Sequence, residues 1–399
     1  MKNTNVLISG AGIAGTALAY WLRRHGFTPT VVERASEIRE GGYKVDIRGA
    51  ALEVVRRMGV LDEIRQLRTD VRAGSVVDAT GKRVASMDGD TFGGRVHGDA
   101  EILRGDLNRI LYELTKNDVE YLFDDSIASL TDGSDGVKVT FDSGRIEVFD
   151  LVLGADGLHS RTRGLVFGPE SRFVRDLGHY ISIFSVPNRL DLDREELTYV
   201  GAGRTVLTYS TARDTGAKAM FLFASEPLTY DHRDRAEQQR LLANAYAGEG
   251  WQVPGLLEGM ASAPDFYFDS LSQVHMDRWS QGRVALVGDA ACCASPASGQ
   301  GTGLALVAAY VLAGELAAAG GEYEAGFAGY ERQLRPFAEQ NQKLGPANVK
   351  RMVMRTSGQV RFSMVMLSLM ARLPGKERIM AKLIEPIHKA ATAITLSEY

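Results

Sequence analysis

Three glycines near the N-terminus have the spacing of a dinucleotide-binding turn. Gly10, Gly12 and Gly15 form the pattern G-x-G-x-x-G between an apolar run at residues 5–9 and an amphipathic stretch at residues 13–25. The first glycine of such a turn permits a sharp bend, the second lets a pyrophosphate approach the backbone, and the third lets helix and strand pack closely. The pattern therefore predicts a strand, a turn and a helix that bind the phosphates of a dinucleotide.

An acidic residue follows at the distance that such a site requires. Glu33 ends a second β-like run at residues 30–33 and lies 23 residues after Gly10. An acid placed about 20 residues after the turn accepts hydrogen bonds from ribose hydroxyls. Because a carboxylate would repel a ribose 2′-phosphate, we expect the nucleotide to belong to FAD or NAD rather than to NADP.

Two further segments place polar residues directly after apolar, strand-like runs. Asp156-Gly157 follows one run and Gly288-Asp289 follows another. Ligands of open α/β sheets bind at the carboxyl ends of the strands, so both segments are expected to contact the dinucleotide. Other Asp-Gly pairs, such as Asp88-Gly89, lack this placement and are predicted to be simple turns.

Together these motifs resemble those of the class A flavoprotein monooxygenases, the family of para-hydroxybenzoate hydroxylase. The likeness covers nearly the whole chain and rests on the glycine turn with Glu33, on a D-G-x-x-S-x-x-R pattern starting at Asp156, and on Gly288-Asp289-Ala290-Ala291 followed by Pro296 and Gly299-Gln300-Gly301. It implies an enzyme that uses FAD, NADPH or NADH, and dioxygen. The enzyme would insert one oxygen atom into a small apolar aromatic or polycyclic substrate, by hydroxylation or by a Baeyer–Villiger reaction.

The resemblance also assigns roles to residues. It implies that Asp289 holds the ribityl chain of FAD, that Arg104 contacts the flavin nucleotide, and that the backbone of Gly299, Gln300 and Gly301 lies near the flavin ring. The full set of cofactor-binding residues that it implies is Gly10, Gly12, Ala14, Gly15, Glu33, Arg34, Arg39, Asp46, Arg104, Leu107, Asp156, Gly157, Gly288, Asp289, Pro296, Gly299, Gly301 and Thr302.

Within that family, residues 41–46 most resemble the tetracycline-inactivating and antibiotic-tailoring monooxygenases. This narrower likeness implies that Asp46 lies near the isoalloxazine and Arg39 near NADPH; solvated loop charges are an equal alternative for Arg39 and Lys44. The sequence departs from the family at Cys292, where many members have histidine, and at Thr302-Gly303. These departures concern the surroundings of the flavin ring and the choice of substrate.

The order of apolar runs predicts an α/β fold with a discontinuous Rossmann-like FAD-binding domain. Its three segments are residues 1–72, 97–170 and 271–322. A mainly antiparallel β-sheet domain for the substrate is predicted from residues 73–96 and 171–270, where short β-like runs alternate with polar turns. Residues 323–399 are predicted to form a C-terminal helical segment.

Aromatic residues in the inserted domain are candidates for the substrate pocket, although an aromatic residue at each of these positions is more often plain core. They are Tyr180, Phe184, Tyr209, Phe221 and Phe223. His159 and His275 are candidate acids or bases. None of the seven histidines is arranged as H-x-x-x-H or beside a cysteine pair, so we expect no metal.

Composition limits the remaining possibilities. The 399 residues carry 46 basic and 50 acidic side chains, which argues against a nucleic-acid partner. The two cysteines, Cys292 and Cys293, are adjacent, so we expect buried thiols, no disulfide and a cytoplasmic location. Residues 362–369 are predicted to form a methionine-rich core helix, without stable membrane association, in a monomer or homodimer.

Two classes of alternative stay open. One is a flavoprotein that binds a metabolite without turnover, which would not consume NADPH or NADH. The other is a different flavin chemistry on the same fold, such as that of an oxidase, a reductase or a halogenase. Trp21, Trp251 and Trp279 are too far apart for the W-x-W pair of flavin halogenases, which weakens that option.

Overall fold

A six-stranded sheet carries the glycine turn in the computed structural model, which describes residues 1–39, 41–96, 98–370 and 376–399. The predicted domain boundary at residue 97 lies outside the described residues. The strand order is β17-β18-β11-β1-β2-β7, and every pairing is parallel except that of β17 with β18. The strands are β1 (Asn5–Ser9), β2 (Thr28–Val32), β7 (Glu120–Leu122), β11 (Leu151–Gly154), β17 (Ser280–Gln281) and β18 (Val284–Leu286).

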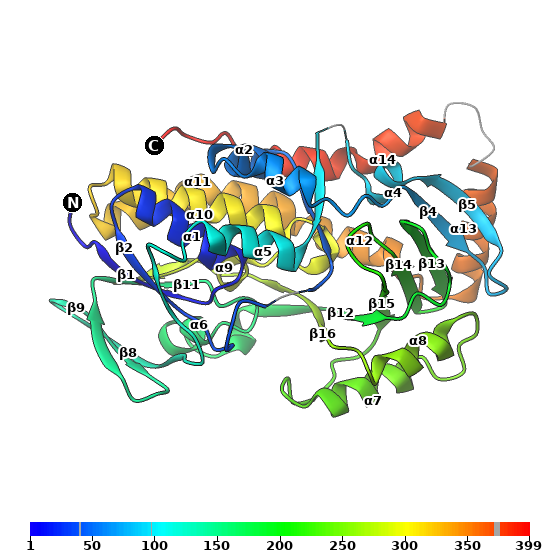
Figure 1. Cartoon of the computed structure of the whole chain (residues 1–399), viewed down its shortest axis with the longest axis horizontal. Coiled ribbons are helices and arrows are strands. Elements are labelled where there is room, and N and C mark those ends of the chain that lie inside the picture. The colour runs from blue at the N-terminus through cyan, green and yellow to red at the C-terminus, as the bar shows by residue number, and fades with distance from the viewer. Residues whose placement is uncertain (40, 97, 371–375) are drawn as a thin grey trace.

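Helices cover one face of this sheet and a small β-meander covers the other (Figure 1). On β1, Val6 and Ile8 point into the helical core, whereas Leu7 points into the cluster formed with the meander. This alternation follows from the two-residue period of a strand. The helices are α1 (Ile13–Arg24), α5 (Arg104–Glu113), α10 (Gly301–Ala318) and α11 (Tyr323–Gln342), and the meander is β8 (Ile127–Gly133), β9 (Gly136–Phe141) and β10 (Ile146–Phe149).

A second, seven-stranded sheet lies beside the first and is mainly antiparallel, as predicted. Its order is β16-β12-β15-β14-β13-β4-β5, with only β13 and β4 parallel. The strands are β4 (Ala73–Val77), β5 (Arg83–Asp88), β12 (Val174–Val186), β13 (Glu195–Gly201), β14 (Arg204–Tyr209), β15 (Ala217–Ala224) and β16 (Phe266–Val274). Two helices that the sequence analysis did not anticipate, α7 (Arg235–Ala245) and α8 (Val253–Met260), pack on its outer face.

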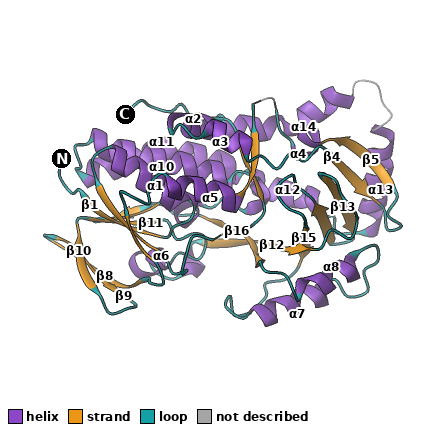
Figure 2. Cartoon of the chain, in the orientation of Figure 1, coloured by secondary structure: helices purple, strands orange, loops and turns teal. Residues whose placement is uncertain are grey.

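Short elements and the C-terminal helices join the two sheets (Figure 2). The strands β3 (Lys44–Ile47) and β6 (Ala100–Leu103) form a two-stranded sheet, and α2 (Ala50–Arg57), α3 (Leu61–Gln66) and α4 (Gly89–Gly93) lie close to it in sequence. The C-terminal helices are α12 (Leu344–Met352), α13 (Ser357–Met370) and α14 (Lys376–Ala391). The last residue, Tyr399, donates toward Glu315 of α10 and Gln333 of α11, so the tail ends beside the first sheet.

Two helices differ from what their apolar composition suggests. α10 is long and apolar enough to cross a membrane, but 72% of that window is buried inside the protein, where it packs against α1 and α11. The prediction that residues 362–369 lie in the core is wrong. They form part of α13, on which Phe362 is 69% exposed and Leu369 is 53% exposed.

Buried charges connect the two-stranded sheet to the second sheet. The ammonium of Lys44 lies 2.5 Å from a carboxylate oxygen of Glu196 on β13 and 3.1 Å from one of Glu101 on β6. All three side chains are at most 14% exposed. Burial opposes the charge of Lys44, but the two carboxylates raise its pKa above the ordinary value. Lys44 is therefore an internal ion-pair residue, not a solvated loop charge.

Replacing Lys44 with methionine should destabilise the protein, because Glu196 would keep a buried charge without its partner. Breaking a buried ion pair in this way costs about 3 kcal/mol, so the melting temperature should fall clearly. The matched control is Lys2→Met, because the Lys2–Glu322 pair is exposed and should contribute nothing measurable. Equal melting temperatures for the two variants would contradict this prediction.

Candidate flavin site

The glycine turn has no room for side chains at Gly10 and Gly15, but the backbone at Gly12 is open. A Cβ atom on Gly15 would lie 1.9 Å from the carbonyl oxygen of Gly10, and Gly10 itself has a φ of +103°. A Cβ on Gly12 would meet only the guanidinium of Arg104, at 3.8 Å. No side chain caps the start of α1. Its first N–H groups are therefore directed at the space beside Gly12, where phosphates bind at helix N-termini.

Glu33 closes the turn from the end of β2. One carboxylate oxygen accepts a hydrogen bond from the N–H of Ala11 at 2.9 Å, and the other accepts one from Ala35 at 2.9 Å. The side chain is thus fixed against the turn at the end of the strand next to β1. This is the position from which an acid reaches the ribose of a bound dinucleotide.

Arg104 and Asp289 lie on facing loops at the same edge of the sheet. Arg104 begins α5, its N–H donates to the carbonyl of Tyr43 at 2.9 Å, and its stem lies against Gly42. Asp289 begins the short helix α9 (Asp289–Cys292). Burial raises the pKa of Asp289, while its contact with the Cys293 thiol and the charge of Arg104 oppose that rise. A carboxylate and a guanidinium are therefore available to hydroxyl and phosphate groups between the two loops.

The side chains of the D-G-x-x-S-x-x-R segment mainly form hydrogen bonds that fix the loop in which they lie. The Asp156 carboxylate accepts hydrogen bonds from the hydroxyl of Ser160 and from the N–H and hydroxyl of Thr162 at 2.5–2.8 Å. Arg163 is completely buried and donates to the carbonyl oxygens of Ala290 and Leu158. The bond to Ala290 ties this loop to the one that carries Asp289, so Asp156 and Arg163 act by positioning.

The turn before α10 meets the requirements for a ligand. Cβ atoms on Gly299 or Gly301 would meet nothing within 4 Å, and no acidic residue or side-chain cap occupies the first turn of α10. Gln300 is 3% exposed, and its amide nitrogen has no hydrogen-bond partner among the described residues. An open backbone and an orphaned buried donor at a helix N-terminus together fit an anionic or polar ring edge.

The other residues implied to bind the cofactor differ in their surroundings. Arg34 and Arg39 are exposed near Glu33, whereas Ala14 and Leu107 are buried in the helical core. Asp46 pairs with Arg48 at 2.7 Å through one carboxylate oxygen, and its other, buried oxygen lies 3.6 Å from the guanidinium of Arg95 without a hydrogen bond among the described residues. Gly157 and Gly288 lie in the loops already described, Pro296 begins a short 3-10 helix before α10, and Thr302 lies in the first turn of α10.

Four of the five aromatic substrate candidates lie on the outer face of the second sheet. Tyr180, Phe184, Phe221 and Phe223 belong to the core formed with α7 and α8. The period of a strand predicts that Tyr180 shares a face with Phe184, and Phe221 with Phe223, and both pairs are correct, but that face is turned away from the flavin residues. Tyr209 lies on the inner face, where its hydroxyl accepts a hydrogen bond from the N–H of Lys44 at 3.1 Å.

The inner face carries a different set of half-buried side chains, which the sequence analysis did not single out. Tyr267 is 36% exposed, and its ring centre lies 6.2 Å from that of Tyr43, next to Arg104 and Asp289. The strand alternation places Leu207 and Met220 on the same face. The two-residue period of β14 and β15 could have grouped Leu207 and Met220 on a strand face, but only the orientation of the sheet shows which face looks toward the flavin residues.

His159 connects the Asp156 loop to the second sheet. Its Nε2 lies 3.1 Å from both oxygens of Asp269 on β16, and its Nδ1 lies 3.0 Å from Glu170. Burial alone would lower the pKa of His159, but the two carboxylates raise it to about 9. His159, His232 and Asp269 also bring possible ligand atoms within 4.8 Å of one another. The raised pKa of His159 favours the ring form with a proton on each nitrogen, which has no free lone pair for a metal. The expectation of no metal stays a prediction. The ring of His275 hydrogen-bonds to the side chain of Gln273 at 3.0 Å.

Both cysteines are buried, which agrees with the expectation of unreactive thiols. Burial and the charge of Asp289 raise the pKa of Cys292 and of Cys293 above the ordinary value. A nucleophilic thiol needs the opposite shift.

Comparison with known proteins agrees with this geometry. The model of the FAD-binding domain family matches residues 3–247 and 257–344. A flavin-dependent monooxygenase of Legionella longbeachae is 44% identical over 86% of this chain and 88% of its own length. An uncharacterised protein of Mycobacterium tuberculosis is 49% identical over 86% of this chain and 93% of its own. The crystal structure of the tetracycline destructase Tet(51) has a TM-score of 0.87, with 39% identity over 99% of each chain.

This chain belongs to the FAD-dependent monooxygenases. Three features fit FAD: the open backbone at Gly12, the carboxylate of Glu33, and the unpartnered donor of Gln300 beside the N-terminus of α10. The α/β fold with a Rossmann-like sheet and a second, mainly antiparallel sheet is confirmed.

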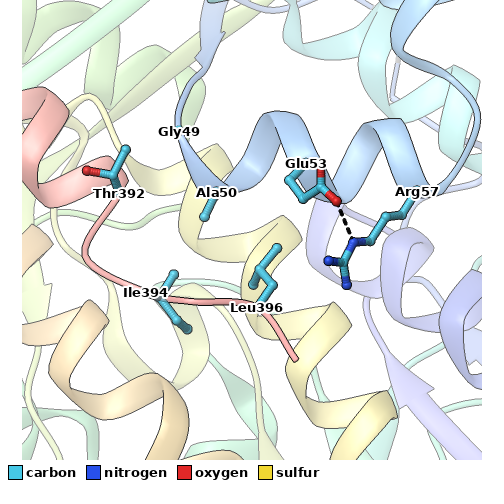
Figure 3. A pocket seen from close by; sticks show the side chains of 7 residues that line it. All are labelled: Gly49, Ala50, Glu53, Arg57, Thr392, Ile394 and Leu396. Atoms are coloured by element: carbon cyan, nitrogen blue, oxygen red, sulfur yellow. Dashed lines mark hydrogen bonds and ion pairs between the residues drawn. The ribbon is translucent and has the colours of Figure 1, made fainter. Parts of the chain in front are cut away.

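The pocket drawn in Figure 3 lies outside this site. It has a volume of about 240 Å³ between α2 and the C-terminal tail, and its walls include Glu53, Arg57 and Leu396. Arg57 pairs with Glu53 and donates to the carbonyl oxygen of Ser397 at 2.8 Å, which holds the tail in place. The pocket contains none of the residues assigned to FAD in this monooxygenase.

Replacing Asp289 with alanine should weaken FAD binding by roughly 1.5–3 kcal/mol, the contribution of a hydrogen bond to a charged group. The measurement is the dissociation constant of FAD for reconstituted apoprotein, followed by flavin fluorescence. Asp277→Ala is the control, because Asp277 is exposed on a nearby loop. An unchanged FAD affinity in Asp289→Ala would reject the assignment of this carboxylate to the cofactor.

The raised pKa of His159 predicts a pH-dependent contribution to stability. An unfolded histidine has a pKa of about 6.5, so a folded pKa of about 9 means that folding favours the protonated form. The stabilisation is complete below about pH 6.5 and is lost as the pH rises through about 9.

His159→Gln should therefore lower the melting temperature most below about pH 6.5. The difference from wild type should shrink as the pH rises above about 9. His275→Gln is the control, because burial lowers the pKa of His275 and the trend should run the other way. A constant difference between wild type and His159→Gln at all pH values would disprove the assignment.

Proposed function

We propose that this monooxygenase inserts one oxygen atom from dioxygen into a polycyclic substrate of the tetracycline type, with NADPH or NADH as the electron donor. The observation that carries the proposal is the 39% identity over 99% of both chains with a tetracycline destructase. The half-buried Tyr267, Met220 and Leu207 support it, because they give the inner sheet face a broad apolar and aromatic surface beside the flavin residues.

Bound FAD supplies the redox chemistry, namely acceptance of a hydride and reaction with dioxygen. The protein contributes position and electrostatics. The uncapped N-terminus of α10 would stabilise negative charge on the edge of the ring, because the helix dipole is positive there. Arg104 and Asp289 would hold the phosphate and ribityl groups. Tyr43 and Tyr267 would exclude water from the substrate side.

The assignment of residues to domains belongs to the same proposal. Residues 1–72, 97–170 and 271–322 would bind FAD, residues 73–96 and 171–270 would bind the substrate, and residues 323–399 would brace the two. The two buried free thiols suit a reducing compartment such as the cytoplasm.

Tetracycline should stimulate NADPH oxidation by the FAD-loaded protein, and the product should contain one oxygen atom from labelled dioxygen and none from labelled water. Mass spectrometry of the product, with hydrogen peroxide measured in parallel, distinguishes the outcomes. Oxidation of tetracycline without incorporation of dioxygen-derived oxygen would indicate an oxidase. Binding without any consumption of NADPH or NADH would favour a carrier.

In the same assay, Tyr267→Ala should lower kcat/KM by roughly 10- to 100-fold, the effect of losing one large apolar contact. Tyr20→Ala, which removes a partly buried tyrosine from α1, is the control and should leave kcat/KM unchanged. If both variants keep the wild-type value, Tyr267 does not contact the substrate.

A further inference from the structure

The helix α13 presents an apolar stripe to its surroundings. Phe362 is 69% exposed, Val365 54%, Met366 41% and Leu369 53%. Their spacing of i, i+3, i+4 and i+7 places them on one side of the helix. Among the described residues, eleven large apolar side chains are at least 36% exposed, and these four are the largest group on one element. Scattered exposed apolar residues need no explanation, but a contiguous stripe indicates a binding surface.

The opposite side of α13 is already occupied. Val360, Met364 and Leu367 are only partly exposed, and the helix contacts β5 and β13 at the edge of the second sheet. This arrangement is visible at the end of the molecule that carries β5 in Figure 1. The side of α13 that packs on the sheet is therefore a different side from the exposed stripe.

The segment that carries the stripe, residues 350–370, is positively charged, although the protein as a whole is acidic. Residues 350–370 contain four basic residues and no acidic one, whereas the remaining 378 residues contain 42 basic and 50 acidic side chains. The four cations, Lys350, Arg351, Arg355 and Arg361, are all exposed. Within the described part of the chain, none of them forms an ion pair. Their charges are thus available to an external anionic partner.

We propose that α13 docks on the anionic surface of a lipid bilayer, with Phe362, Val365, Met366 and Leu369 entering the headgroup region. An apolar face bordered by Lys and Arg is the pattern of helices that lie in a membrane interface. The local positive charge on an acidic molecule also favours anionic lipid over a second copy of this chain, which would bring like charges together. This role goes beyond the oxygenation reaction and does not depend on the identity of the substrate.

The test is sedimentation of the FAD-loaded protein with phosphatidylcholine vesicles prepared with and without phosphatidylserine. The protein should bind the vesicles that contain phosphatidylserine, bind neutral vesicles far more weakly, and dissociate at high salt. Arg355→Gln combined with Arg361→Gln should lower the partition coefficient about 25-fold, since each basic residue near an anionic surface contributes about fivefold. Phe362→Ser combined with Leu369→Ser should lower it by about tenfold or more.

Matched controls come from surfaces away from α13. Ile146→Ser combined with Val148→Ser removes two apolar side chains that are 56% and 55% exposed, and Lys138→Gln removes an exposed cation. Both should bind vesicles like the wild type. Flavin absorbance of every variant reports that the protein remains folded.

Three results would overturn the proposal. These are no binding to vesicles, equal binding to neutral and anionic vesicles, and variants in α13 that bind like the controls. If the wild type is instead a dimer in sedimentation equilibrium and Phe362→Ser with Leu369→Ser makes it a monomer, the stripe is an interface between two copies of the chain.

Discussion

The close approach of α1 to β1 at Gly15 determines where the other parts of the flavin site can lie. A Cβ atom at this position would nearly coincide with the carbonyl oxygen of Gly10, so helix and strand could not keep their present separation with any other residue. This contact aims the N-terminus of α1 at the space beside Arg104. It also allows α10, which packs along α1, to bring its own N-terminus to the same edge of the sheet. The positive N-terminal ends of α1 and α10 thus converge on one region, and no side chain caps either helix there.

The second sheet must then be held at a fixed distance from this edge of the first sheet. Ion pairs, rather than apolar packing alone, hold it there. Lys44 joins Glu101 to Glu196, and His159 joins the Asp156 loop to Asp269. The pairs of Lys44 are buried, whereas the His159 side chain is 34% exposed, and ion pairs of both kinds contribute little net stability compared with apolar packing. Their geometry is nevertheless demanding, so they fix one relative position of the sheets. We infer that these ion pairs set the position of the second sheet relative to the sheet that carries the flavin residues.

The sequence could predict features that depend on local order. The glycine turn, β1 and α1 agree with the structure to within a residue or so, because the spacing of the three glycines fixes a turn between an apolar run and an amphipathic stretch. It could not predict features that depend on orientation. The period of a strand correctly pairs Tyr180 with Phe184, and Phe221 with Phe223, on one face of each strand, but it does not say which face looks toward the flavin. Tyr267, Asp269 and His159 meet across more than 100 residues of sequence, and no local pattern signals that encounter.

The same limit explains the error about α13. An apolar helix reads as a core helix when its composition alone is considered, and α13 does bury one side against the sheet. β5 is an edge strand, and edge strands need a cover that blocks pairing with other chains. A helix with a single apolar face would provide that cover, and solvent would favour polar residues on the other face. Because α13 has apolar residues on both sides, covering β5 accounts for Met364 and Leu367 but not for Phe362 and Leu369. The outward residues require a second environment that is less polar than water.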